Sequence, residues 1–163
     1  MFYIEIENKI VLFDTDRDRL ENTLEFMPQY SDAQIQETEK EIVYINDEFR
    51  FKEDVLKEIR LQEIEQELAQ VDRLYEITMN TPILYTNGHY YKPRYVQESY
   101  VLLLAADIFP ITIWDSTELN SVEMAKNDLL ILSMFLKGIA EPAFQERKTN
   151  RLSLLLEKEE LLV

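Results

Sequence analysis

The chain repeats one pattern three times: a short segment typical of a β-hairpin is followed by a segment with helical periodicity. The hairpin segments concentrate aromatic and β-branched residues around polar turn residues, as half-buried strands require. Asn87-Gly88, in the third segment, is the dipeptide that best accepts the positive φ angles of a type I′ turn. Strands are expected at residues 3–7 and 10–13 around Asn8-Lys9, at 42–45 and 49–51 around residues 46–48, and at 83–86 and 89–92.

Two helices are predicted within residues 1–80. Residues 16–27 form a short helix that is stopped by Pro28. Residues 54–79 form the longest helical segment, which ends before Pro82. Apolar positions in this second helix are spaced by 3, 4, 3 and 4 residues, the spacing of a coiled-coil core. We call these positions the 61–75 stripe: Leu61, Ile64, Leu68, Val71 and Tyr75.

The 61–75 stripe has two interpretations. It can pack on the chain's own domain, or it can bind a partner helix. In a parallel homodimer, Arg60 would face Glu65 favourably and Glu67 would face Asp72 unfavourably, so the flanking charges do not select self-pairing. The stripe is therefore a candidate partner-binding site, with self-association through residues 54–79 as one case.

Residues 81–163 are predicted to form a small, mostly helical domain. Residues 95–106 have the pattern of an almost fully buried helix, and residues 111–114 have that of a short strand. Asn120 and Glu123 match the polar cap and the following glutamate that satisfy free N–H groups at a helix start. Gly138 and Pro142 then end or kink that helix, and a last helix is expected over 142–162.

The predicted fold class is α+β, with short β-hairpins and helices in the N-terminal half and a small, mostly helical C-terminal domain. The expected division is an acidic hairpin and helix module at 1–52, a connecting helix at 53–80 and the mostly helical domain at 81–163.

Composition removes many classes of active site. The 163 residues include no cysteine, one histidine and two glycines. Zinc and iron–sulfur sites need thiolates or several imidazoles, and a phosphate-binding loop needs glycines in one short stretch, whereas Gly88 and Gly138 lie far apart. We expect no catalytic residues, no metal, no cofactor and no small-molecule substrate, and we predict that the protein is not an enzyme.

Charge separates the two halves of the chain. The net charge is −15, and residues 1–80 carry 9 basic and 21 acidic side chains, whereas residues 81–163 carry 8 and 11. An acidic first half is repelled by phosphate backbones and by anionic lipid, so neither nucleic acid nor a membrane is expected as a partner. The same half could imitate DNA. Apolar runs of eight residues, at 99–106 and 129–136, are too short to span a bilayer, and the N-terminus lacks the basic region of a secretory signal.

Four local patterns were weighed for chemistry. His89 is interpreted as an exposed turn residue without a catalytic role, because no nucleophile is placed beside it by a known motif. Trp114 is interpreted as a core residue rather than a ligand platform. The acidic segment 14–18 begins like a calcium loop, but Arg19 stands where that loop needs glycine, so a helix N-terminus rich in carboxylates is preferred. The basic segment 147–151 is either solvated or docks on an acidic surface, on a partner or on the chain's own first half.

Residues 95–156 resemble a small tail-associated domain of unknown function that recurs in bacteriophage and prophage proteins, commonly beside tail-fibre and tail-fibre-assembly genes. The resemblance rests on the order of YVQESY (95–100), ITIWD (111–115), NSVE (120–123) and IAEPAFQER (139–147). The chain departs from the family at Pro142, where the family helix runs on, and at residues 116–119, where an Asp-Gly or Asp-Asn turn is more typical.

The resemblance implies a phage tail protein that binds other tail or tail-fibre proteins, either as a structural adaptor at the tail fibre or baseplate or as a tail-fibre assembly factor. Its expected location is the virion tail, or the host bacterial cytoplasm during assembly. An acidic DNA mimic that inhibits a nucleic-acid-binding protein is the alternative, and a glycosidase with paired carboxylates, one with a raised pKa, is the third hypothesis.

Overall fold

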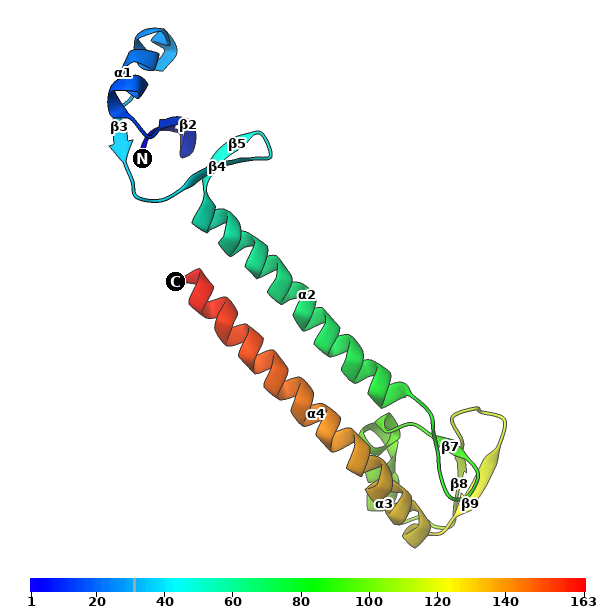
Figure 1. Ribbon diagram of the computed structural model, residues 1–163. Helices are drawn as coiled ribbons and strands as arrows, with labels where there is room; N and C mark the ends of the chain where they lie inside the picture. The colour runs from blue at the N-terminus through cyan, green and yellow to red at the C-terminus, as the bar shows by residue number, and fades with distance from the viewer. Residues whose placement is uncertain (31) are drawn as a thin grey trace. The chain divides into compact units, whose positions relative to one another are not determined.

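A computed structural model describes residues 1–30 and 32–163 (Figure 1). The chain forms two compact units, residues 1–63 and residues 64–163, and each is described by itself. The boundary between them lies inside one long helix, α2 (Lys52–Asn80). This helix confirms the prediction of a helix over 54–79, and the α+β fold class is also confirmed.

The first unit contains a five-stranded antiparallel sheet with strand order β3-β1-β2-β5-β4. One short helix, α1 (Arg17–Glu25), follows β2 and matches the helix predicted for residues 16–27. A 3₁₀ turn at Pro28–Tyr30 comes next. The strands are β1 (Phe2–Ile6), β2 (Lys9–Asp14), β3 (Ile35–Glu37), β4 (Ile42–Ile45) and β5 (Glu48–Phe51).

Both hairpins predicted in this unit are confirmed, because β1 pairs with β2 and β4 pairs with β5. Their turns have two residues with positive φ each, Glu7 and Asn8 in the first and Asn46 and Asp47 in the second. Two consecutive positive φ angles match the right-handed twist of the flanking strands. Strand β3 was not predicted, since its three residues carry no alternation long enough to recognise.

The core of this unit is small and aromatic. Tyr3, Ile10 and Ile42 are buried together, and phenylalanines from β2 and β5 pack around them. Tyr3 meets Phe51 edge to face at 5.3 Å between ring centroids, which is a preferred arrangement for two aromatic rings. The concentration of aromatic residues in the predicted strands is therefore what builds the core of the sheet.

The second unit consists of the rest of α2, two small hairpins and two further helical segments (Figure 1). Its larger buried cluster is drawn from both hairpins and both further helical segments: Tyr91, Val96, Tyr100, Ile113, Met124, Leu129, Leu132 and Leu136. The elements are β6 (Ile83–Leu84), β7 (Tyr90–Tyr91), a π-helical turn (Val96–Tyr100) continued by α3 (Val101–Ala106), β8 (Ile111–Trp114), β9 (Ser121–Met124) and α4 (Lys126–Leu162).

The third predicted hairpin is present, but its predicted type I′ turn is wrong. Gly88 has a φ of 84°, whereas Asn87 has no positive φ. The Gly88 amide donates to the Tyr85 carbonyl at 2.9 Å, and the Tyr85 amide donates to the His89 carbonyl at 2.8 Å. These bonds describe a longer turn with glycine in the left-handed position. Asn87 instead uses its side chain, accepting from the His89 amide and donating to the Tyr91 hydroxyl.

The predicted helix start at Asn120 is wrong, because residues 121–124 form strand β9, which pairs with β8, and the helix begins at Lys126. Ile113 lies opposite Val122 and Ile111 lies opposite Met124, so alternate side chains of β9 reach the core. A polar residue followed three positions later by glutamate is compatible with a strand as well as with a helix cap. Pairing with β8 is what makes residues 121–124 a strand.

The two predicted helices that meet at Gly138 and Pro142 are one helix, α4, which spans 37 residues. Pro142 removes one backbone donor but does not end the helix. Leu129, Leu132, Leu136 and Ala140 are buried along one face before Pro142. Ala143, just after Pro142, packs against the cluster that contains Ala140, and this packing continues the helix.

Two burial predictions are also corrected. Residues 95–106 are not almost fully buried, because Val96 and Tyr100 face the core while Leu102 is 69% exposed. Trp114 is not a core residue, since it is 58% exposed. Strand β8 turns Ile113 inward, so Trp114, its neighbour, points to the other face of the strand. No helix within residues 1–30 and 32–163 has the length and apolarity to cross a membrane.

Candidate interaction surface

Helices α2 and α4 run side by side in the second unit (Figure 1), and two residues of the 61–75 stripe, Val71 and Tyr75, lie at this contact. Near the end of α2, Tyr75 and Met79 are buried in one cluster with Ala140, and Ala143 packs against it. The small side chains of α4 allow the bulky residues of α2 to approach closely. This contact joins segments separated by more than sixty residues of sequence.

The residues of the 61–75 stripe differ in exposure. Ile64 is 0% exposed and Tyr75 is buried, whereas Leu61, Leu68 and Val71 are half-buried. Tyr75 packs on α4 of the same chain. At this residue the stripe therefore packs on its own domain, as the first of the two interpretations predicted. In this conformation Ile64 and Tyr75 are not accessible to another protein.

A polar clamp holds the two helices together beside the stripe. The Arg147 Nε atom donates to Asp72 Oδ1 at 2.7 Å, and the Arg151 guanidinium donates to the other oxygen of the same carboxylate. Arg147 also lies over the Tyr75 ring, 4.7 Å from its centroid, which adds a cation–π contact. Farther along, Lys158 Nζ is 3.0 Å from Glu65 Oε1. Arginines of the basic segment 147–151 therefore dock on the chain's own acidic helix.

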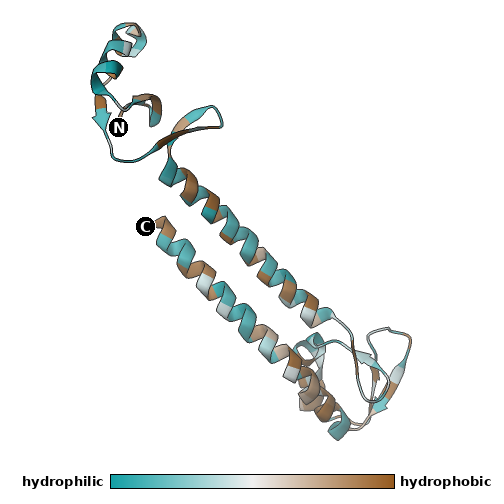
Figure 2. Ribbon diagram, viewed as in Figure 1, coloured by the Kyte–Doolittle hydropathy of each residue, from teal (hydrophilic) through white to brown (hydrophobic). Residues whose placement is uncertain are grey.

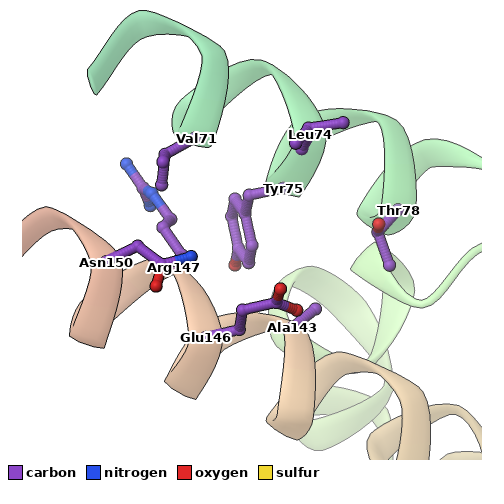
Figure 3. A pocket seen from close by; sticks show the side chains of 8 residues that line it. All are labelled: Val71, Leu74, Tyr75, Thr78, Ala143, Glu146, Arg147 and Asn150. Atoms are coloured by element: carbon purple, nitrogen blue, oxygen red, sulfur yellow. The ribbon is translucent and has the colours of Figure 1, made fainter. Parts of the chain in front are cut away.

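A cavity lies between the helices next to this clamp (Figure 3). Figure 3 shows the Tyr75 ring pointing from α2 toward Arg147 and Ala143 on α4, with Val71 and Thr78 on either side. The volume of this cavity is about 70 Å³. Cavities that bind small molecules usually measure about 300–1,000 Å³, so this space is a packing defect of the helix pair and not a substrate site.

Asp115 connects the two hairpins of the second unit. It is 2% exposed, and it accepts hydrogen bonds from the Thr117 amide and hydroxyl and from Asn120 Nδ2. His89 Nδ1, from the other hairpin, lies 3.3 Å from Asp115 Oδ2. These hydrogen bonds lower the pKa of Asp115 to about 2, and the bond from the Thr117 hydroxyl has the largest effect. His89 is thus half-buried and paired, which its sequence context did not indicate.

An open hollow beside Asp115 exposes Trp114 and Tyr95 together with Glu118. The hollow brings two carboxylates close to aromatic rings, the kind of place where a glycosidase pair was considered. A general acid needs a raised pKa, and the pKa of Asp115 is shifted in the opposite direction. Asp115 acts here as a structural acceptor that fixes the turn between β8 and β9.

Apolar side chains remain exposed on α3 and on the loop after it. Val101 is 57% exposed, Leu102 69% and Ile108 72%. Phe144 on α4 shares a hollow with Val101. Contiguous exposed apolar groups mark protein contacts more often than single ones do.

Carboxylates in the first unit are partly neutralised by neighbouring cations. Arg50 holds Glu58 through two hydrogen bonds, which lower the pKa of Glu58. Other ion pairs of this unit include Lys9–Glu48, Arg17–Glu21, Lys40–Glu53 and Lys52–Glu41. Some of the acidic side chains of this unit are thus neutralised by local ion pairs.

The acidic segment 14–18 caps α1. Asp16 is the N-cap, and its side chain accepts from the Asp18 amide at 3.0 Å, while Asp14 accepts from the Asp16 amide at 2.9 Å. Both bonds satisfy amides at the helix start. Among the described residues, no group of three or more histidine, aspartate and glutamate side chains is arranged to hold a metal ion.

Comparisons with known protein families, with curated proteins and with solved structures found no match to this chain.

Proposed function

We propose that this chain is a non-enzymatic bacteriophage tail protein that acts by binding other proteins, as a structural adaptor at the tail fibre or baseplate or as a tail-fibre assembly factor. One observation carries the proposal: Val101, Leu102 and Ile108, on α3 and the loop after it, are each more than half exposed. They lie within residues 95–156, the segment that resembles the tail-associated domain. Exposing these side chains to water is unfavourable, and a bound protein would bury them.

The proposal is tested by identifying the neighbouring genes, purifying the full chain and any tail-fibre protein that they encode, and measuring the affinity of the two proteins by calorimetry. Leu102→Asp places a charge in the exposed apolar group, and we expect at least about tenfold weaker binding. Leu119→Asp is the matched control, because Leu119 is 82% exposed in the β8–β9 turn. Equal loss in both variants, or no binding by the unmodified chain, contradicts the proposal.

Adaptor and assembly factor differ in where the protein ends up. Mass spectrometry of purified virions detects an adaptor at a fixed ratio to the fibre, whereas an assembly factor is found only in the lysate of infected cells. A DNA mimic would behave differently from both, because its affinity for a nucleic-acid-binding protein would fall steeply between low and physiological salt.

A further inference from the structure

Helix α4 carries two apolar stripes, and only one of them is covered. The covered stripe includes Leu136 and Ala140 and faces the rest of the second unit. The second stripe lies on a different side of the helix, beyond the row formed by Arg147, Arg151 and Lys158, the residues that bind α2. Figure 2 shows hydrophobic residues recurring between hydrophilic ones along α4 up to its C-terminal end.

We call the second stripe the outer stripe. Its members are spaced by 4, 3, 4 and 3 residues, so they share one side of the helix. Leu152 is 56% exposed, Leu155 40% and Leu162 61%, and Lys148 and Glu159 are exposed as well. Phe144 and Leu156 flank it, and both are exposed. The outer stripe consists of Lys148, Leu152, Leu155, Glu159 and Leu162.

The order of residues in the outer stripe is self-complementary when two copies run antiparallel. If Leu152 of one copy lies against Leu155 of the other, the same alignment places Lys148 against Glu159 of the other copy. Two-fold symmetry repeats each of these contacts. The two leucine pairs form the centre, and one Lys–Glu pair lies at each side. A parallel alignment would instead place Lys148 against Lys148 and Glu159 against Glu159, which is repulsive.

We propose that the outer stripe binds a second copy of this chain, and that the two α4 helices pair antiparallel about a two-fold axis between residues 153 and 154. Charge complementarity selects this occupant, because the same four positions, Lys148, Leu152, Leu155 and Glu159, supply both sides of the contact. The paired segment, residues 148–159, is about 18 Å long at 1.5 Å per residue. A contact of this size is small, so we expect dissociation constants in the micromolar range.

This inference does not depend on the proposed function. It also differs from self-association through residues 54–79, because Ile64 and Tyr75 of that helix are buried within the chain. The outer stripe uses another helix and another alignment.

A charge-swap series tests the alignment, with the full chain studied by sedimentation equilibrium over a range of concentrations. The unmodified chain should form dimers. Lys148→Glu alone places glutamate against Glu159, and Glu159→Lys alone places lysine against Lys148, so each should weaken dimerisation at least about tenfold. The double variant Lys148→Glu/Glu159→Lys restores opposite charges and should recover dimerisation. An equimolar mixture of the two single variants should form heterodimers.

Controls separate the alignment from net charge and from folding. Lys137→Glu and Glu160→Lys change the charge of α4 equally but lie outside the outer stripe, and we expect unchanged dimerisation. Circular dichroism should give the same helical content for all variants, because every substituted side chain is exposed. A monomeric unmodified chain overturns the proposal. Failure of the double variant to recover, while it stays folded, overturns the antiparallel alignment.

Discussion

The two glycines of this chain stand in opposite backbone environments. Gly88 has a φ of 84°, in the left-handed region that side chains disfavour, whereas Gly138 lies inside helix α4. A Cβ atom added to either glycine meets no atom within 4 Å. The backbone conformation alone therefore distinguishes them.

We predict that alanine substitution changes stability in opposite directions at these two positions. Gly88→Ala should lower the free energy of unfolding by about 1–2 kcal/mol, because a side chain is strained at this φ. Gly138→Ala should raise it by about 0.5–1 kcal/mol, because alanine loses less entropy in a helix. Urea unfolding of both variants is the measurement. Effects of the same sign would contradict the conformations described.

We predict that Asp115 makes the free energy of unfolding depend on pH. Its folded-state pKa, about 2, is below the unfolded value near 3.8, so its carboxylate stabilises the folded chain above the unfolded pKa and loses this effect as the pH falls toward 2. The unmodified chain should therefore exceed Asp115→Asn in stability at pH 6, and the difference should shrink between about pH 4 and pH 2. Unfolding measured across this range gives the result.

At the scale of elements, the apolar residues of helix α2 differ in how deeply they are buried. Ile64 is completely buried and Ile77 is 52% exposed on the same helix. Ile64→Ala should cost about 2–5 kcal/mol, because it removes buried methyl groups and leaves a cavity. Ile77→Ala should change stability by less than about 0.5 kcal/mol. Thermal unfolding compares the two, and a similar loss at both positions would show that the burial of Ile64 contributes nothing.

Elements whose pattern is local could be predicted from the sequence, and those decided by distant contacts could not. The hairpin at residues 42–51 and helix α2 carry their own turn residues and periodicity. Strand β9 has a helix-cap pattern, and only its pairing with β8 makes it a strand. Likewise, Pro142 is a helix breaker by itself, and the packing of Ala140 and Ala143 on either side of it keeps α4 continuous.

The candidate surface was predictable in part for the same reason. The 61–75 stripe was visible as a spacing, but its contact with α4 depends on residues far along the chain. The pairing of Asp72 with Arg147 spans 75 positions, and no local pattern indicates it. Asp115 was also missed, since its partners come from both hairpins. No known motif places a nucleophile beside His89 in the sequence, and the sequence gave no sign of this carboxylate partner.

At the scale of the whole molecule, the chain divides into two compact units, and the clusters that hold the second unit together are made by its own residues. A fragment of residues 52–163 contains all of α2 and the whole second unit. We predict that this fragment folds without residues 1–51 and unfolds cooperatively. Circular dichroism and amide hydrogen exchange are the measurements. A fragment whose Leu132 and Leu136 amides exchange as fast as in an unfolded peptide would contradict the division.

The distance along the chain between the partners of the α2–α4 contact has a consequence during protein synthesis. Glu65 and Lys158 are 93 residues apart, and ribosomes add about 5–20 residues per second. Helix α2 therefore leaves the ribosome about 5–20 s before the residues that cover it. In that interval Ile64 and Tyr75 are exposed on an unpaired helix, and the nascent chain is most open to chaperones, to proteases and to neighbouring nascent copies of itself.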